Sequence, residues 1–75
     1  MNAKEMFEKL DYSWEETKDY IKYTKYNWKH WIFNSKTTIY FWKVWSEIQI
    51  YSDFAIHIDL LQAINKQVEE LGWYE

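Results

Sequence analysis

The sequence predicts an α+β fold, in which an antiparallel sheet of three or four strands carries the N- and C-terminal helices on one face. Apolar residues recur at three- and four-residue intervals near both ends of the chain, which is the helical period. Between the ends, β-branched and aromatic residues alternate with polar ones, as in strands. The chain has 75 residues, so we expect a single domain over residues 1–75 with the order α-β-β-β-(β)-α.

Large aromatic side chains take the place of the disulfides and metal sites that usually stabilise so small a domain. The chain has no Cys and only two His, far apart in sequence, so we expect no disulfide, no metal site and no cofactor. Aromatic residues make up 23% of the chain, and each can bury roughly 150–250 Å². The absence of Cys fits a reducing compartment, and the sequence shows no leader or long apolar span. We therefore expect a cytoplasmic protein that does not associate with membranes.

The first helix has clear start and stop signals. Asn2 and Glu5 have the spacing of a capping box, in which each side chain accepts a hydrogen bond from the other residue's amide. Asp11 should adopt the left-handed conformation that ends the helix, and Tyr12 should fold back toward Phe7. The apolar stripe of this helix is Ala3, Met6, Phe7 and Leu10.

The C-terminal helix is longer and also carries its own stop signal. It should begin near His57 or Asp59 and end before Gly72, which occupies the C′ position. In this arrangement Trp73 should pack on Val68. The apolar stripe of the helix is Ile58, Leu61, Ile64, Val68 and Leu71.

Alternating residues predict the strands between the helices. Residues 13–17 are polar around one Trp and are expected to form a connection, Asn27 a turn, and Ser52 and Asp53 another turn. The predicted strands are Asp19–Tyr26, Trp28–Phe33, Thr38–Trp45 and Glu47–Tyr51.

The stretch Trp28–Trp45 should form a hairpin that is apolar on both faces. A three-residue turn at Asn34-Ser35-Lys36 would place Trp31 and Phe33 beside Ile39 and Phe41, whereas a two- or four-residue turn would reverse this match. With three residues, the second face carries Trp28, His30, Tyr40 and Trp42. Two helices can cover only one face of the sheet, so we expect a homo-oligomer, a dimer or larger, or another partner on the second face.

Positive charge gathers around the same hairpin. The segment from Lys18 to Lys43 holds six Lys and one acid, a net charge of +5, whereas the remainder holds three Lys and eleven acids, a net charge of −8. Lysines alternating with aromatic rings are typical of sites that stack a base and neutralise a phosphate. We expect no extended duplex as a ligand, because the acidic remainder of the domain would repel its backbone. The candidate ligand-binding residues are Trp28, His30, Tyr40, Trp42, Lys22, Lys29 and Lys43, with Tyr20, Tyr26 and Trp45 nearby in the pattern.

No catalytic motif accompanies this surface. His57 with Asp53 or Asp59 is better explained by a position at the start of a helix, and His30 among aromatic residues by a structural role. A chain with one Gly contains no glycine-rich phosphate loop. We therefore expect no catalytic residues and a protein that is not an enzyme.

The two ends of the chain resemble a group of phage proteins. The segments Ala3–Leu10 and Leu61–Trp73 are similar to the ends of small proteins, with no assigned activity, that are encoded by phages and prophages of low-GC Gram-positive bacteria. In that group the first motif commonly ends in Leu-Gly-Tyr, whereas here Asp11 holds the Gly position. The resemblance implies a phage accessory protein that acts in the cytoplasm of a bacterial host, and it transfers no functional residues.

Three functional hypotheses follow from these observations. The first is a counter-defence or host-takeover protein that sequesters a nucleotide-type immune signal at or between its subunits. The second is a stoichiometric inhibitor of a host defence or nucleic-acid enzyme, which would bind that host protein through the acidic helices. The third is a structural or regulatory homodimer without a ligand. The acidic residues of the second hypothesis are Glu5, Glu8, Asp59, Glu69 and Glu70.

Overall fold

A computed structural model describes residues 1–30, 33–52 and 55–74, with the backbone alone for residues 27–30 and 33–35. It confirms the α+β class, because the chain forms an antiparallel sheet of four strands in the order β1-β2-β3-β4 and two helices that pack on this sheet. The elements are α1 (Ala3–Lys9), β1 (Ser13–Glu16), β2 (Tyr20–His30), β3 (Phe33–Trp42), β4 (Glu47–Tyr51) and α2 (Ile58–Glu70).

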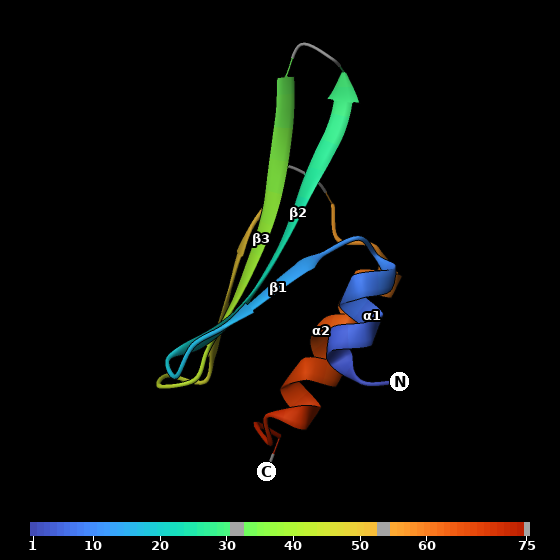
Figure 1. Cartoon of the computed structure of the whole chain (residues 1–75). Coiled ribbons are helices and arrows are strands. Elements are labelled where there is room, and N and C mark those ends of the chain that lie inside the picture. The colour runs from blue at the N-terminus through green and yellow to red at the C-terminus, as the bar shows by residue number, and fades with distance from the viewer. Residues whose placement is uncertain (31–32, 53–54, 75) are drawn as a thin grey trace.

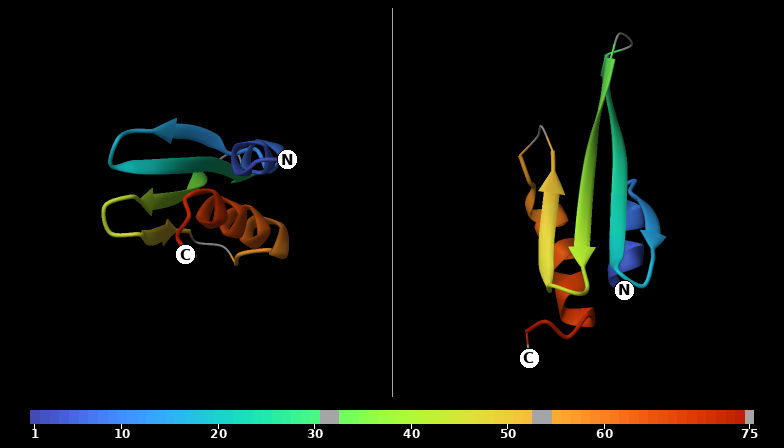
Figure 2. Two further views of the ribbon diagram at one scale, coloured as in Figure 1. Left: turned by 90° about the horizontal axis from the view of Figure 1, so that it is seen from below. Right: turned by 90° about the vertical axis from the view of Figure 1, so that its left-hand side faces the viewer.

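Both helices lie on the same side of the sheet (Figures 1 and 2). In the right-hand view of Figure 2, α1 lies behind β1 and β2, and α2 lies behind β3 and β4. The other side carries no helix or strand of the described chain. We call these two sides the helix face and the outer face. The hairpin of β2 and β3 extends beyond both helices (Figure 1).

The core lies between the helix face and the two helices. Alternate residues of β2 and β3 supply its sheet side, and Phe7 from α1 lies at its centre. The Phe7 ring stacks on Tyr23, with ring centroids 3.7 Å apart, and meets Phe41 edge-on at 6.2 Å. The buried apolar residues of this core are Phe7, Tyr12, Ile21, Tyr23, Ile39, Phe41, Leu60, Ala63, Ile64 and Val68.

One hydrogen bond links the sheet to α2 inside the core. The Tyr23 hydroxyl donates to Oε1 of Gln67 at 2.6 Å, and both side chains are buried. Burial raises the pKa of Tyr23 far above its usual value, so the phenol stays protonated and remains a donor. The pair therefore satisfies two polar groups that would otherwise be costly to bury.

The helix signals read from the sequence are confirmed. The Asn2 side chain accepts from the Glu5 amide at 2.8 Å, and the Glu5 carboxylate accepts from the Asn2 amide at 3.1 Å. Helix α2 begins after His57, whose side chain makes no capping hydrogen bond. The Trp73 amide donates to the Val68 carbonyl at 3.2 Å, and Trp73 packs against the core that contains Val68.

Both helices end in the same hydrogen-bond pattern. The Tyr12 amide donates to the Phe7 carbonyl at 3.0 Å, five residues earlier in the chain. At the end of α2, the Trp73 amide donates in the same way to the Val68 carbonyl. Such an end requires a left-handed residue, and Asp11 and Gly72 take this place with φ of 70° and 75°. The contact of the Tyr12 and Phe7 rings, with centroids 5.5 Å apart, accompanies the first of these ends.

Replacing Asp11 with Gly is expected to stabilise the protein by up to about 1 kcal/mol, because glycine adopts a positive φ without the steric penalty of a Cβ. Thermal denaturation should show a rise of up to about 4–8 °C for a domain of this size. Gly72→Ala is the matched control at the other helix end. Apart from Gly72 itself and its two chain neighbours, no atom of the described residues lies within 4 Å of the added Cβ, so its loss of about 1 kcal/mol would come from the backbone conformation alone. An unchanged melting temperature for both variants would contradict this account.

Three predictions about the middle of the chain are wrong. Residues 13–16 form β1, which pairs with β2, instead of a connection. Asn27 lies within β2, which runs unbroken from Tyr20 to His30, because its backbone pairs with Ser35. The predicted turn at Asn34-Ser35-Lys36 lies inside β3, whose first residue, Phe33, pairs with His30 of β2. In each case a continuous ladder of backbone hydrogen bonds outweighed the local preference of polar residues for turns.

Of two further strand predictions, one is confirmed and the other differs from the structure at its end. The fourth strand, Glu47–Tyr51, is confirmed at both bounds. Strand β3 ends at Trp42, three residues before the predicted end, because residues 43–46 form the turn into β4. Two predictions concern positions outside the described residues: the face of the sheet on which Trp31 lies, and the turn at Asp53.

Candidate ligand-binding face

Aromatic side chains cluster on the outer face near the ends of β2 and β3. Tyr40 and Trp42 lie parallel, with ring centroids 5.1 Å apart and planes 9° apart. Tyr20 meets both rings edge-on, at 5.4 Å from Tyr40 and 5.2 Å from Trp42. Tyr51 lies 6.1 Å from Tyr40, and Trp45 lies 5.6 Å from Trp42. We call these five residues the outer aromatic cluster.

The sheet register brings this cluster together. Tyr20 of β2 pairs with Trp42 of β3, and Lys22 pairs with Tyr40. On the other side of β3, Tyr40 pairs with Gln49 of β4. Residues two apart on a strand share a face, and directly opposite residues lie on the same face of a sheet. Three strands therefore place aromatic and polar groups side by side on the outer face.

A shallow depression of about 410 Å³ lies on the outer face over these rings. A second depression of about 220 Å³ lies next to it, toward β1. The larger depression is lined by Tyr20, Lys36, Thr38, Tyr40, Trp42, Gln49 and Tyr51. The smaller is lined by Ser13, Trp14, Glu15, Lys22, Thr24, Tyr26 and Lys36. Lys36 belongs to both, so the two depressions form one surface with two lysines, and open aromatic rings beside cations suit a planar, anionic ligand.

Polar groups fix the orientation of several rings. The Trp42 indole Nε1–H donates to Oε1 of Gln49 at 2.9 Å. The Tyr20 hydroxyl donates to Oε2 of Glu15 at 2.8 Å, and this hydrogen bond to a carboxylate raises the pKa of Tyr20. The Lys22 ammonium lies 5.7 Å from the centroid of Tyr40, within the range of a cation–π contact. The face thus holds oriented aromatic rings and a lysine in contact with one of them.

The structure brings three of the seven predicted site residues together, namely Lys22, Tyr40 and Trp42. Trp28 pairs with Asn34, six residues along β2 from Lys22, which corresponds to about 20 Å of strand. His30 pairs with Phe33 at the far end of the hairpin, and Lys29 lies at the irregularity between Trp28 and His30. The side chains of these three residues lie outside the described part of the chain.

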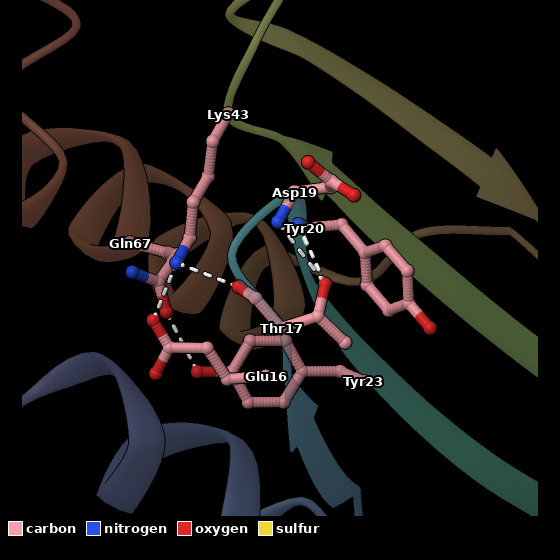
Figure 3. A network of polar contacts seen from close by, with 7 residues as sticks. All are labelled: Glu16, Thr17, Asp19, Tyr20, Tyr23, Lys43 and Gln67. Atoms are coloured by element: carbon pink, nitrogen blue, oxygen red, sulfur yellow. Dashed lines mark hydrogen bonds and ion pairs between the residues drawn. The ribbon is translucent and has the colours of Figure 1, made fainter.

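Lys43 lies on the helix face and makes a different contact. Figure 3 shows its ammonium group directed at Glu16 and Thr17. Nζ lies 2.6 Å from Oε2 of Glu16 and 2.9 Å from the Thr17 carbonyl oxygen. The Lys43 amide also donates to the Asp19 carbonyl at 2.9 Å. Lys43 therefore ties the end of β3 to the connection between β1 and β2.

Sequence reasoning missed four lining residues of the larger depression, namely Lys36, Thr38, Gln49 and Tyr51. Lys36 was placed in a turn, and its true position in β3 follows from the longer ladder. Gln49 and Tyr51 lie in the correctly predicted β4, but only the pairing of β4 with β3 puts them beside Tyr40. Alternation along β4 could have shown that Gln49 and Tyr51 share a face.

Residues 1–30, 33–52 and 55–74 contain no group of three His, Asp or Glu side chains able to hold a metal ion. Within the same residues, no helix is long and apolar enough to cross a lipid bilayer. Comparisons with protein-family models, curated proteins and solved structures found no match to this chain.

Proposed function

We propose that this protein acts by binding and that its outer face holds a nucleotide-type ligand. The observation that carries the proposal is the outer aromatic cluster, in which Tyr40 and Trp42 lie parallel and Lys22 approaches Tyr40 on the open side of the sheet. A nucleobase can stack on such rings, and a lysine can neutralise the phosphate attached to it.

The size of this surface fits a small ligand. The larger depression measures about 410 Å³, within the range of small-molecule sites at about 300–1,000 Å³. Stacking contributes on the order of 1–3 kcal/mol per base, so two engaged rings supply up to about 6 kcal/mol. Acids also border the face, because Glu15 bonds Tyr20 and Glu47 pairs with Trp42 in the register. A long polyanion would meet these acids, which favours a mono- or dinucleotide.

The resemblance to phage proteins suggests what such binding is for. A phage-encoded protein without catalytic residues can remove a nucleotide-type immune signal by holding it in a stoichiometric complex. We therefore propose counter-defence by sequestration as the biological role, in the cytoplasm of a bacterial host.

Thermal denaturation with a panel of cyclic and linear mono- and dinucleotides tests the proposal. At least one nucleotide should raise the melting temperature, and the same ligand should change the fluorescence of the tryptophans. Nucleosides and inorganic phosphate serve as controls, because each supplies only half of the recognised chemistry. If no nucleotide changes either signal at millimolar concentration, the proposal is wrong.

The inhibitor hypothesis has less structural support. Glu70 accepts a hydrogen bond from the Ala3 amide at 2.8 Å, and Glu5 belongs to the capping box. Glu69 lies 3.6 Å from Nζ of Lys66. Three of its five acidic residues therefore make contacts within the protein. Charge reversal at Glu8 and Asp59 separates the two hypotheses, because it should abolish activity in cells only if the acidic helices bind the target.

A further inference from the structure

Strand β4 forms an open edge of the sheet, since among the described residues it pairs with β3 alone. The backbone groups on its other side are a template for a further strand. We propose that a second copy of this chain pairs there in antiparallel orientation, so that two sheets join into one around a twofold axis. This inference stands on β4 and α2 and does not depend on the ligand proposed for the outer face.

The two edges of the sheet differ in their protection. Natural proteins guard exposed edges with charged residues, which discourage pairing with another chain. Strand β1 carries Glu15 and Glu16, and the Lys4 ammonium lies 4.2 Å from the ring of Trp14. Strand β4 carries one charged residue, Glu47, at its first position. Its edge is therefore open to pairing, whereas the β1 edge is guarded.

The sequence of β4 is complementary to itself. Opposite residues in an antiparallel pair share a face, so a symmetric pairing must be centred on a residue. Only a centre at Gln49 pairs all five residues of the strand. It sets Ile48 against Ile50 of the second copy and Glu47 against Tyr51 of the second copy. No like charges meet, and four isoleucines form one row on the helix face.

Apolar surface lies on the helix face along this edge. Ile48 and Ile50 remain 36% and 39% exposed, although they pair with the buried Phe41 and Ile39. On α2, Glu70 bonds to α1 and so marks the flank that faces α1. At 3.6 residues per turn, Leu61 lies on the opposite flank, toward β4, and it is 43% exposed. A second copy at β4 would cover these side chains.

This arrangement leaves the outer face open. Gln49 and Tyr51 of β4 line the larger depression. The larger depressions of the two copies would therefore lie next to each other, on either side of the paired β4 strands. The sequence predicted a homo-oligomer that covers the outer face. Pairing through β4 instead covers the exposed isoleucines and keeps both outer faces accessible to ligand.

Light scattering combined with size-exclusion chromatography tests the proposal without any ligand. The native protein should have twice the mass of its 9.5 kDa chain. Ile50→Lys places a charge in the row of isoleucines and should give a monomer that keeps its circular dichroism spectrum. Trp42→Lys, on the outer face, is the matched control and should remain a dimer. A native monomer at submillimolar concentration, or a dimer lost in Trp42→Lys and kept in Ile50→Lys, would overturn the proposal.

Cross-linking gives a second readout that does not require a destabilising change. The native chain has no Cys, so Gln49→Cys introduces a single thiol directly opposite its copy, with Cβ atoms about 4.5–5.5 Å apart. Mild oxidation or a short bis-maleimide should link Gln49→Cys efficiently, whereas Glu15→Cys on the β1 edge should stay unlinked. Equal yields for the two variants would count against pairing through β4. A dimer that binds no nucleotide would refute the proposed function alone.

Discussion

Phe7→Ala is expected to remove a large part of the protein's free energy of unfolding. Truncating a buried Phe costs about 3–5 kcal/mol, and a domain of 75 residues has a total stability of about 4–11 kcal/mol. Phe7 is fully buried and contacts Tyr12, Tyr23 and Phe41 from three other parts of the chain. Removing this one ring therefore opens the contact of α1 with the sheet. Urea denaturation followed by circular dichroism would measure the loss.

The matched control for this change is Tyr26→Thr. Tyr26 is also an aromatic residue in the sheet, but it is 57% exposed, and Thr keeps the preference for a strand. We expect its free energy of unfolding to change by less than about 1 kcal/mol. Equal losses for the two variants would show that the core is not centred on Phe7.

Trp42→Ala is expected to weaken nucleotide binding by about 5- to 150-fold, which corresponds to 1–3 kcal/mol of lost stacking. Trp42 is the outer-face residue that contacts both Tyr20 and Tyr40, and its indole N–H is held by Gln49. Its removal takes away one stacking surface and the neighbour that keeps Tyr40 parallel. Titration calorimetry with the best nucleotide of the panel would measure the loss.

Tyr74→Ala provides the control for Trp42→Ala, because Tyr74 is exposed and lies beyond α2. Its affinity for nucleotide should equal that of the native protein. Lys22→Gln should cause a smaller loss than Trp42→Ala and should weaken the salt dependence of binding, since a phosphate contact is screened by salt. Lys66→Gln, on α2, should change neither quantity. If Trp42→Ala binds as well as the native protein, the ligand does not occupy the outer aromatic cluster.

The local signals of the sequence determined much of this protein. The capping box at Asn2, the left-handed Asp11 and the C′ position of Gly72 were all predicted and confirmed. Each depends on hydrogen bonds within a few residues, so composition and spacing contain the required information. The α+β class and the bounds of β4 follow from hydrophobic periods of the same short range.

Only the tertiary structure decided the register of the long hairpin and which residues share the outer face. Asn27 and Ser35 favour turns locally, yet they pair with each other inside one ladder, which shifts the register so that residues 34–36 lie within β3. That shift sets Lys22 opposite Tyr40 and leaves Trp28 at the far end of the hairpin. Register is a property of two segments distant in sequence, and it depends on backbone pairing and on burial against the helices. Neither quantity is encoded in any one stretch of residues, so the outer aromatic cluster could be identified only after folding had placed Tyr20, Tyr40 and Tyr51 on neighbouring strands.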